Sequence, residues 1–285
     1  MAENSPDAGW FAGLDRGDLD AAREAIETGT ADDPRDWPAL AVESGFATDE
    51  EDYYEALHEA TVHAARAAAS ERERAGDRQL VHALRSMDDC ERTANELAER
   101  VAEWAASRYD ESGTGVEYAR ELAGSDPDDP AGERLVALAD RVVDLADEAD
   151  ALRAYVERAA PTVAPNLADL AGPVLAARLI SLAGGLESLA KKPSGTVQVL
   201  GAEEALFSHL RGHAPSPKHG VIYLHDAVRN TDPEHRGSAA RALAGKLAIA
   251  ARIDHYSGER DPDLAAALDE RIKRIRDRTA GESDE

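Results

Sequence analysis

Positively charged side chains recur through the C-terminal half of the chain at positions that could hold phosphate groups. Lys218 and His219 occupy the proline-rich loop APSPKHG, where backbone N–H groups are also available. Arg241 and Arg252 are eleven residues apart, about three turns of a helix, and therefore share one face. For each residue alone, solvation or pairing with a carboxylate is as good an explanation as phosphate binding. Together they favour binding to the phosphate backbone of a nucleic acid. The candidate set is Lys191, Lys218, His219, Arg236, Arg241 and Arg252.

The two parts of the chain differ sharply in charge. Residues 1–160 contain 40 acidic and 16 basic side chains, whereas residues 161–285 contain 17 acidic and 16 basic ones. Exposed carboxylates repel phosphate, so the near-neutral part is the one expected to bind a polyanion. Aromatic residues make up only 5% of the chain, which argues against a stacking surface for single strands. Recognition of a folded RNA by its shape fits better.

Signatures of enzymes are sparse. The segment KKPSGT lacks the residue order of a phosphate-binding loop, and neither a dinucleotide-binding glycine motif nor a nucleophile elbow is present. His209 and His213 lie four residues apart and could present two imidazoles to a metal. However, Gly212 and Pro215 predict that the helix ends there, and no carboxylate stands at ligand spacing. We therefore expect a protein without catalytic residues, metal or cofactor.

The acidic composition predicts a protein adapted to high salt. The formal net charge is −25, and only 5 of the 32 basic residues are lysine. Carboxylates keep a surface hydrated in molar salt, where charge repulsion is screened over about 3 Å. An acidic disordered protein fits poorly, because helical periodicity persists along most of the chain.

Cysteine content and hydropathy indicate where the protein works. The single cysteine, Cys90, excludes a disulfide within one chain. No apolar run approaches the roughly 18 residues of a membrane span. The first residues, MAENSPDAGW, lack the basic and apolar regions of a signal peptide. These features predict a cytoplasmic protein that contacts no membrane.

Two long helices must position the C-terminal cations. The first runs from about Asp77 to about Tyr109, and glycine and proline in SGTG and GSDPDDPAG interrupt the chain after it. The second carries a heptad pattern over three heptads. We call this pattern the seam: Leu135, Leu138, Val142, Leu145, Ala149, Leu152 and Val156.

Helices of this kind, joined by a short connection, predict an antiparallel coiled-coil hairpin over residues 77–160. One hairpin leaves an apolar edge over, so pairing with a second copy is expected. The residues expected to form that contact are Leu135, Leu138, Val142, Leu145 and Leu152. The alternative is that both helices pack within one globular bundle.

The remaining segments predict a mainly all-α protein. Residues 1–75 combine turn signals with short helical stretches and form a small N-terminal module. Residues 161–278 turn to glycine, proline and apolar residues, which is typical of a compact helical domain. Residues 279–285 are expected to form a disordered acidic tail.

Three segments of the C-terminal half resemble the Nop domain from end to end. They are APNLADLAGPVLAARLISLAGGLESLAKKPSGTVQVLGAEEALFSHL, then PKHGVIYLHDAV, then RGSAARALAGKLAIAARID. Upstream, DRQLVHALRSMDDCERTANELAERVAEW resembles the first coiled-coil helix of the archaeal scaffolds of box C/D guide ribonucleoproteins, and LRAYVERAAPTVAPNL resembles the end of the second. The resemblance covers about residues 77–278, and its long colinear motifs are highly specific.

The resemblance implies a scaffold without catalytic residues. Such proteins form homodimers through the coiled coil and hold fibrillarin by the N-terminal domain. Fibrillarin uses S-adenosylmethionine to methylate ribose 2′-hydroxyls. The Nop domain binds kink-turn RNA together with its ribosomal-protein-like binder. The family's RNA contacts fall on Lys191, Lys218, Arg241 and Arg252, and its partner-protein contact falls on Gly201, Ala205, Leu206 and Phe207.

Departures from the family pattern weaken parts of this comparison. Glu204 stands where the motif GAEKALF has lysine, and Ser238 stands where RGK has lysine, so two phosphate contacts are lost. The N-terminal module, by which the family holds fibrillarin, and the hairpin connection are shorter than in the family. Two alternatives are a coiled-coil adaptor without RNA and a spliceosomal-type kink-turn binder without a methyltransferase partner.

Overall fold

The computed structural model describes residues 9–31, 33–110 and 112–282. Within these ranges the chain forms helices α1–α14 and one 3₁₀ segment, Val221–Leu224, and contains no strand. The prediction of an all-α fold is therefore confirmed. The chain divides into two compact units, Met1–Ala75 and Gly76–Glu285, which are described separately below.

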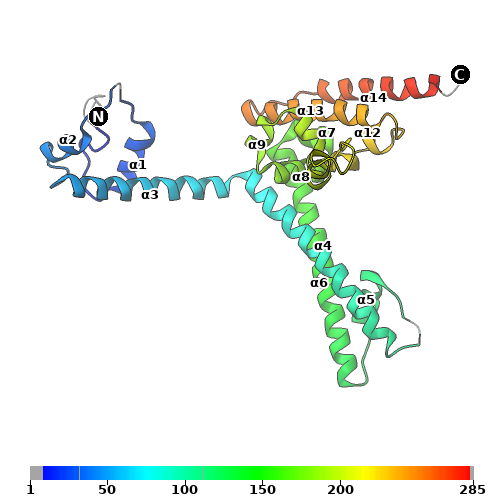
Figure 1. The fold of residues 1–285 in the computed structure, drawn as a ribbon. Coiled ribbons are helices and arrows are strands. Elements are labelled where there is room, and N and C mark those ends of the chain that lie inside the picture. Colours follow the sequence, from blue (N-terminus) through cyan, green and yellow to red (C-terminus); the bar gives the residue numbers. More distant parts are fainter. Residues whose placement is uncertain (1–8, 32, 111, 283–285) are drawn as a thin grey trace. The chain divides into compact units, whose positions relative to one another are not determined.

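The N-terminal unit contains three helices, each begun by an aspartate. They are α1 (Leu19–Thr28), α2 (Trp37–Glu43) and α3 (Glu50–Arg74) (Figure 1). The carboxylates of Asp18, Asp36 and Asp49 each accept a hydrogen bond from a backbone N–H of the first turn that follows. Such caps satisfy donors that have no partner inside the helix.

A small aromatic cluster forms the core of this unit. The rings of Phe11 and Phe46 stack with their centroids 5.4 Å apart, and Trp10 meets Phe46 edge-on at the same distance. The Trp10 Nε1–H donates a hydrogen bond of 3.3 Å to the hydroxyl of Tyr53, which is buried on α3. These few aromatics supply most of the large apolar side chains that a short segment needs for a core.

The second unit begins with the predicted hairpin. Its two long helices, α4 (Gly76–Ala106) and α6 (Pro130–Val163), run side by side in opposite directions (Figure 1). The sequence reading did not assign the shorter helix α5 (Gly115–Ala123), which packs against both. Asp129 begins α6 by accepting hydrogen bonds from the N–H groups of Ala131 and Gly132.

The seam is used inside the hairpin, and this corrects the predicted set of dimer contacts. Leu135 and Val142 have no exposed surface within the single chain, so a second copy cannot reach them. Leu138 and Leu145 are partly buried against the core of α4, α5 and α6, and Leu152 against the core of the following domain. Helix α4, the predicted partner, and α5, which was not predicted, together cover the apolar side of α6.

The following domain is a helical cluster around α13. Its members are α7 (Pro165–Ala171), α8 (Pro173–Ala183), α9 (Leu186–Lys191), α10 (Ser194–Val199), α11 (Glu203–Leu210), α12 (Asp226–Arg229), α13 (Arg236–Tyr256) and α14 (Asp263–Glu282). Leu80 and Leu84 at the base of α4 and Val156 on α6 belong to the same hydrophobic core. The hairpin and the domain, considered separately in the sequence, therefore share one core.

A buried carboxylate joins α13 to the start of α7. The two oxygens of Asp254 accept hydrogen bonds from the backbone N–H groups of Asn166 (2.9 Å) and Leu167 (2.8 Å) and from the Asn166 side-chain amide (2.7 Å). The carbonyl oxygen of the Asn166 amide accepts the N–H of Asp261 at 2.6 Å. Asp254 thus caps α7 from a distant helix, which fixes α13 at the centre of the domain.

The C-terminal helix extends further than the sequence indicated. Helix α14 continues to Glu282, four residues into the segment predicted as a disordered tail, because no proline or glycine interrupts it before Gly281. Residues 283–285 lie outside the described part of the chain. Within the described residues no single helix is long and apolar enough to span a membrane; α7 and α8 pass that test only as a pair bent by 116°.

Candidate nucleic-acid interface

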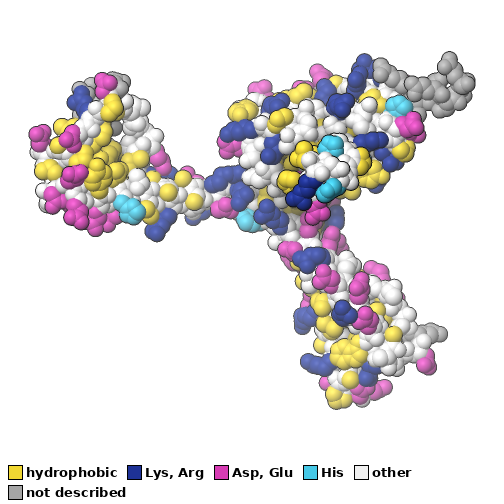
Figure 2. Space-filling model, in the orientation of Figure 1, with side chains coloured by type: hydrophobic (Ala, Val, Ile, Leu, Met, Phe, Trp, Pro, Cys, Tyr) yellow, Lys and Arg dark blue, Asp and Glu magenta, His cyan; other side chains and the backbone are white. Residues whose placement is uncertain are grey.

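The predicted cations fall into three groups on the C-terminal domain. The first lies at the end of α9, the second joins the loop before the 3₁₀ segment to the start of α13, and the third lines a groove between α13 and α14. Figure 2 shows basic side chains spread over this domain, whereas acidic side chains crowd the N-terminal unit. We describe the groups in that order.

At the end of α9, neither predicted cation is free. The Lys191 ammonium lies 2.6 Å from a carboxylate oxygen of Glu187, one turn earlier, and this hydrogen bond raises the pKa of Lys191. Arg252 donates from Nε to the Ala190 carbonyl at 3.1 Å and from Nη2 to the Lys192 carbonyl at 3.3 Å. Arg252 therefore closes the C-terminus of α9, where carbonyl groups lack partners within the helix.

The second group places two cations and a histidine around a tyrosine. The His219 ring stacks on Tyr223 with centroids 4.7 Å apart, and the Arg236 guanidinium lies 5.5 Å from the same tyrosine ring. Lys218 extends its ammonium to within 3.4 Å of the Pro233 carbonyl. Burial, and then the charges of Arg236 and Lys218, lower the pKa of His219. In the described residues no carboxylate pairs with Lys218, His219 or Arg236, and we call Lys218 and Arg236 the loop cations.

Arg236 is held in place by backbone rather than by an acid. Its Nε donates to the Thr231 carbonyl at 3.0 Å and its Nη2 to the Arg229 carbonyl at 3.4 Å. Such contacts fix the guanidinium without neutralising it, which suits a group that meets a phosphate.

The third group contains two cations that the sequence reading left out of the site. Arg241 lines a hollow of about 420 Å³ together with Lys246 of the same helix and Arg271 of α14. One feature of the sequence could have indicated them. None of these three cations has an Asp or Glu three or four positions away on its own helix, so none can form an ion pair along the helix. We call this hollow the α13–α14 groove.

The predicted partner-protein contact lies on a helix without a buried face. Gly201 adopts a positive φ of 80° just before α11, a conformation that glycine tolerates best. On α11, Ala205 is exposed, Leu206 is partly buried and Phe207 keeps 60% of its surface exposed. Leu210 is 71% exposed at the helix end. An apolar helix face left open in this way marks an interaction surface.

Of the two histidines considered for metal binding, His209 and His213, the first contacts a backbone carbonyl. The Nδ1 of His209 lies 3.0 Å from the Ala214 carbonyl, across the turn that ends α11. No group of three or more potential metal-ligating side chains occurs within the described residues.

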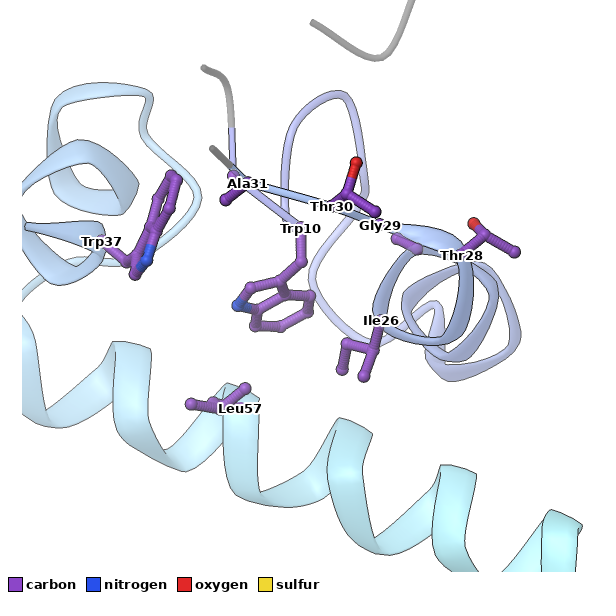
Figure 3. A pocket seen from close by; sticks show the side chains of 10 residues that line it. Trp10, Ile26, Thr28, Gly29, Thr30, Ala31, Trp37 and Leu57 are labelled. Carbon is purple, nitrogen blue, oxygen red and sulfur yellow. The ribbon is translucent and has the colours of Figure 1, made fainter. Parts of the chain in front are cut away.

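An apolar pocket in the N-terminal unit was not predicted from the sequence. It measures about 470 Å³, and Trp10, Ile26, Trp37 and Leu57 turn their side chains toward it (Figure 3). Its other lining residues are alanine, glycine and threonine at the end of α1 and around it. None of the described residues that line the pocket carries a charged side chain, although residues 1–75 contain 19 acidic residues.

Comparison with known proteins identifies the family. Residues 79–277 match the Nop family model, described as "snoRNA binding domain, fibrillarin". The chain belongs to the Nop family. The resemblance inferred from the sequence is thereby confirmed, and the match covers α4 to α14, including all three cation groups.

Individual relatives agree with this assignment. An uncharacterized NOP5 family protein of Methanocaldococcus jannaschii is 35% identical over 237 residues, which cover 70% of this chain and 57% of the relative. Nucleolar protein 58 of Schizosaccharomyces pombe is 31% identical over 234 residues, covering 69% and 46%. Nucleolar protein 56 of Saccharomyces cerevisiae is 39% identical over 158 residues, covering 55% and 31%. The chain thus spans about half the length of these curated relatives, or less.

A solved structure shares the fold. The crystal structure of a fibrillarin/Nop5p complex contains a chain that superposes with a TM-score of 0.53 at 24% identity, covering 94% of this chain and 99% of that one.

Proposed function

We propose that this Nop-family chain is a non-catalytic scaffold of a box C/D guide ribonucleoprotein that works in molar salt. In this role it binds a kink-turn RNA together with the RNA's ribosomal-protein-like binder. It also recruits fibrillarin, the enzyme that carries S-adenosylmethionine and methylates ribose 2′-hydroxyls. The family match and the names of the relatives support the proposal.

The observation that carries the proposal is the separation of cations from carboxylates on the C-terminal domain. The chain has 57 acidic residues, yet the loop cations and the groove cations have no carboxylate partner in the described residues. A phosphate backbone supplies the missing negative charge and releases counterions on binding. The alternative of a coiled-coil adaptor without RNA gives no reason for such a surface.

We propose that α11 meets the protein bound to the kink-turn. Phe207 and Leu210 project from a helix that contributes nothing to the core. Large exposed apolar side chains of this kind become anchors when a partner covers them. The RNA and its binder would then be recognised as one composite surface.

Fibrillarin recruitment is proposed for the N-terminal unit. Its pocket between Trp10 and Trp37 has room for one large apolar side chain of a partner. The pocket is open in the isolated chain, and burying an aromatic or aliphatic group there would desolvate both sides.

Self-association is proposed for the outer surface of the hairpin. Because Leu135 and Val142 are enclosed, a second copy can reach only side chains that the hairpin leaves exposed, such as Trp104 (36% exposed) and Tyr155 (40% exposed). Sedimentation equilibrium of the full chain with Tyr155→Glu tests this, and an unchanged dimer fraction in that variant would remove Tyr155 from the contact.

The central test is a gel-shift series in molar KCl with a box C/D kink-turn RNA, with and without its ribosomal-protein-like binder. Wild type is compared with the double variant Lys218→Ala/Arg241→Ala, whose positions are exposed and outside the core. We expect wild type to bind the pre-formed RNA–protein complex and the double variant to bind it at least tenfold more weakly, as the loss of two phosphate contacts implies. A wild type that ignores the pre-formed complex would overturn the RNA-binding proposal and leave the adaptor.

A further inference from the structure

The α13–α14 groove has a floor of small residues and walls of cations. Ser238, Ala242 and Gly245 follow one stripe along α13, and a Cβ added at Gly245 would meet only open space. Arg241 and Lys246 are five positions apart, about 140° around the helix, so they flank this stripe from its two sides. Helix α14 packs beside α13 (Figure 1).

Arg271 completes the walls from the neighbouring helix. It lines the groove from α14 and is exposed, and its guanidinium forms no hydrogen bond or ion pair with any described residue. The positions three and four residues away on α14 hold Ala267, Leu268, Arg274 and Ile275. None of these can neutralise a guanidinium.

Several cations elsewhere in this domain are paired with acids. Arg229 lies 2.7 Å from Asp226, three residues earlier, and Lys191 pairs with Glu187 in the same manner. In so acidic a chain, three adjacent cations without an acid form a local field that attracts an anion. The groove therefore has the character of a binding site rather than of a solvated surface.

We propose that the α13–α14 groove binds a phosphodiester of the RNA, with Arg271 and Lys246 as ligands beside Arg241. The proposal rests on the function proposed above and extends it to α14. A floor of small side chains lets a sugar–phosphate backbone approach closely, and Ile249, 41% exposed, offers an apolar surface to a ribose. An acidic protein segment is the competing occupant.

The groove is distinct from the loop cations. Arg236 and Arg241 are about 140° apart around α13, so they leave the helix on different sides. An RNA that reaches both sites must therefore pass over the N-terminal end of α13. The backbone is held at two separate points, which fixes the direction in which the RNA leaves the domain.

Charge reversal with a matched control tests the groove. Lys273 is exposed on α14, two positions from Arg271 and about 200° around the helix, so Lys273→Glu makes the same kind of charge change on the opposite side. We expect Arg271→Glu to weaken binding of the pre-formed RNA–protein complex about tenfold. We also expect it to lower the slope of affinity against salt by about one and to expose one stretch of the RNA to hydroxyl-radical cleavage.

A steric variant tests the same groove without changing charge. Gly245→Leu fills the open floor and should weaken binding and expose the same RNA stretch. Equal affinity and footprint for Arg271→Glu and Lys273→Glu, with wild type bound, would overturn the groove while leaving the scaffold function intact. Loss of binding to the fibrillarin subunit instead of the RNA would identify an acidic protein segment as the occupant and also reject the proposal.

Discussion

Arg241 and Arg252 share one face of α13, yet their surroundings predict opposite effects of substitution. Arg252 donates hydrogen bonds to two carbonyls at the end of α9, whereas the Arg241 guanidinium forms no hydrogen bond or ion pair with any described residue. A hydrogen bond from a charged donor contributes about 1.5–3 kcal/mol when buried. Arg252 is exposed, so solvent reduces the sum for its two bonds to about 1–2 kcal/mol. Arg241→Ala should change the free energy of unfolding by less than about 0.5 kcal/mol.

The two variants are compared by guanidinium unfolding, followed by circular dichroism, and by salt-dependent RNA binding. We expect Arg252→Ala to lower the unfolding midpoint and to speed amide exchange in residues 186–192, while the slope of RNA affinity against salt stays as in wild type. Arg241→Ala should keep the midpoint and lower that slope by about one. The reasoning is refuted if Arg252→Ala unfolds like wild type and loses the slope, because Arg252 would then be a phosphate ligand and not a cap.

Three further predictions follow from named contacts. Asp254→Ala leaves three donors without an acceptor and should cost about 3–5 kcal/mol of unfolding free energy, with Asp254→Asn costing about half of that, both measured by denaturant titration. Because burial and neighbouring charges lower the pKa of His219, its ring is neutral in the free protein near pH 7, and an adjacent phosphate would raise that pKa. RNA affinity should therefore rise as the pH falls from about 7 to about 5, and a rise of equal size in His219→Asn would contradict this. Phe207→Ser should leave unfolding unchanged, because the ring is 60% exposed, and should weaken gel-shift binding only when the kink-turn binder is present.

The helical hairpin could be predicted because its pattern is local. The heptad spacing from Leu135 to Val156 defines an apolar side of one helix without reference to the rest of the chain. The elements that cover that side come from other parts of the chain, so the pattern of this one helix does not identify them. The structure covers it with α4 and α5, and this removes Leu135 and Val142 from the predicted contact with a second copy.

The cation site could be predicted only in part, because contacts between distant segments also decide which cations are free. The sequence shows that Arg241 and Arg252 share a face, but it does not show that the carbonyls of α9 lie beside Arg252. Arg271 was missed because it comes from α14, thirty residues beyond Arg241 in the sequence. Only the packing of α13 against α14 brings the two together.

The shared core at the base of the hairpin sets the distance between the hairpin tip and the C-terminal domain. Because Leu80, Leu84 and Val156 pack into the core of the C-terminal domain, the hairpin is fixed to that domain. The 34 residues of α6 measure about 50 Å along the axis. The tip of the hairpin is thus kept at a set separation from the cation groups of the C-terminal domain, and the number of helical turns determines that separation. Inserting seven residues in each of α4 and α6 would lengthen the hairpin by about 10 Å and would increase this separation by the same amount.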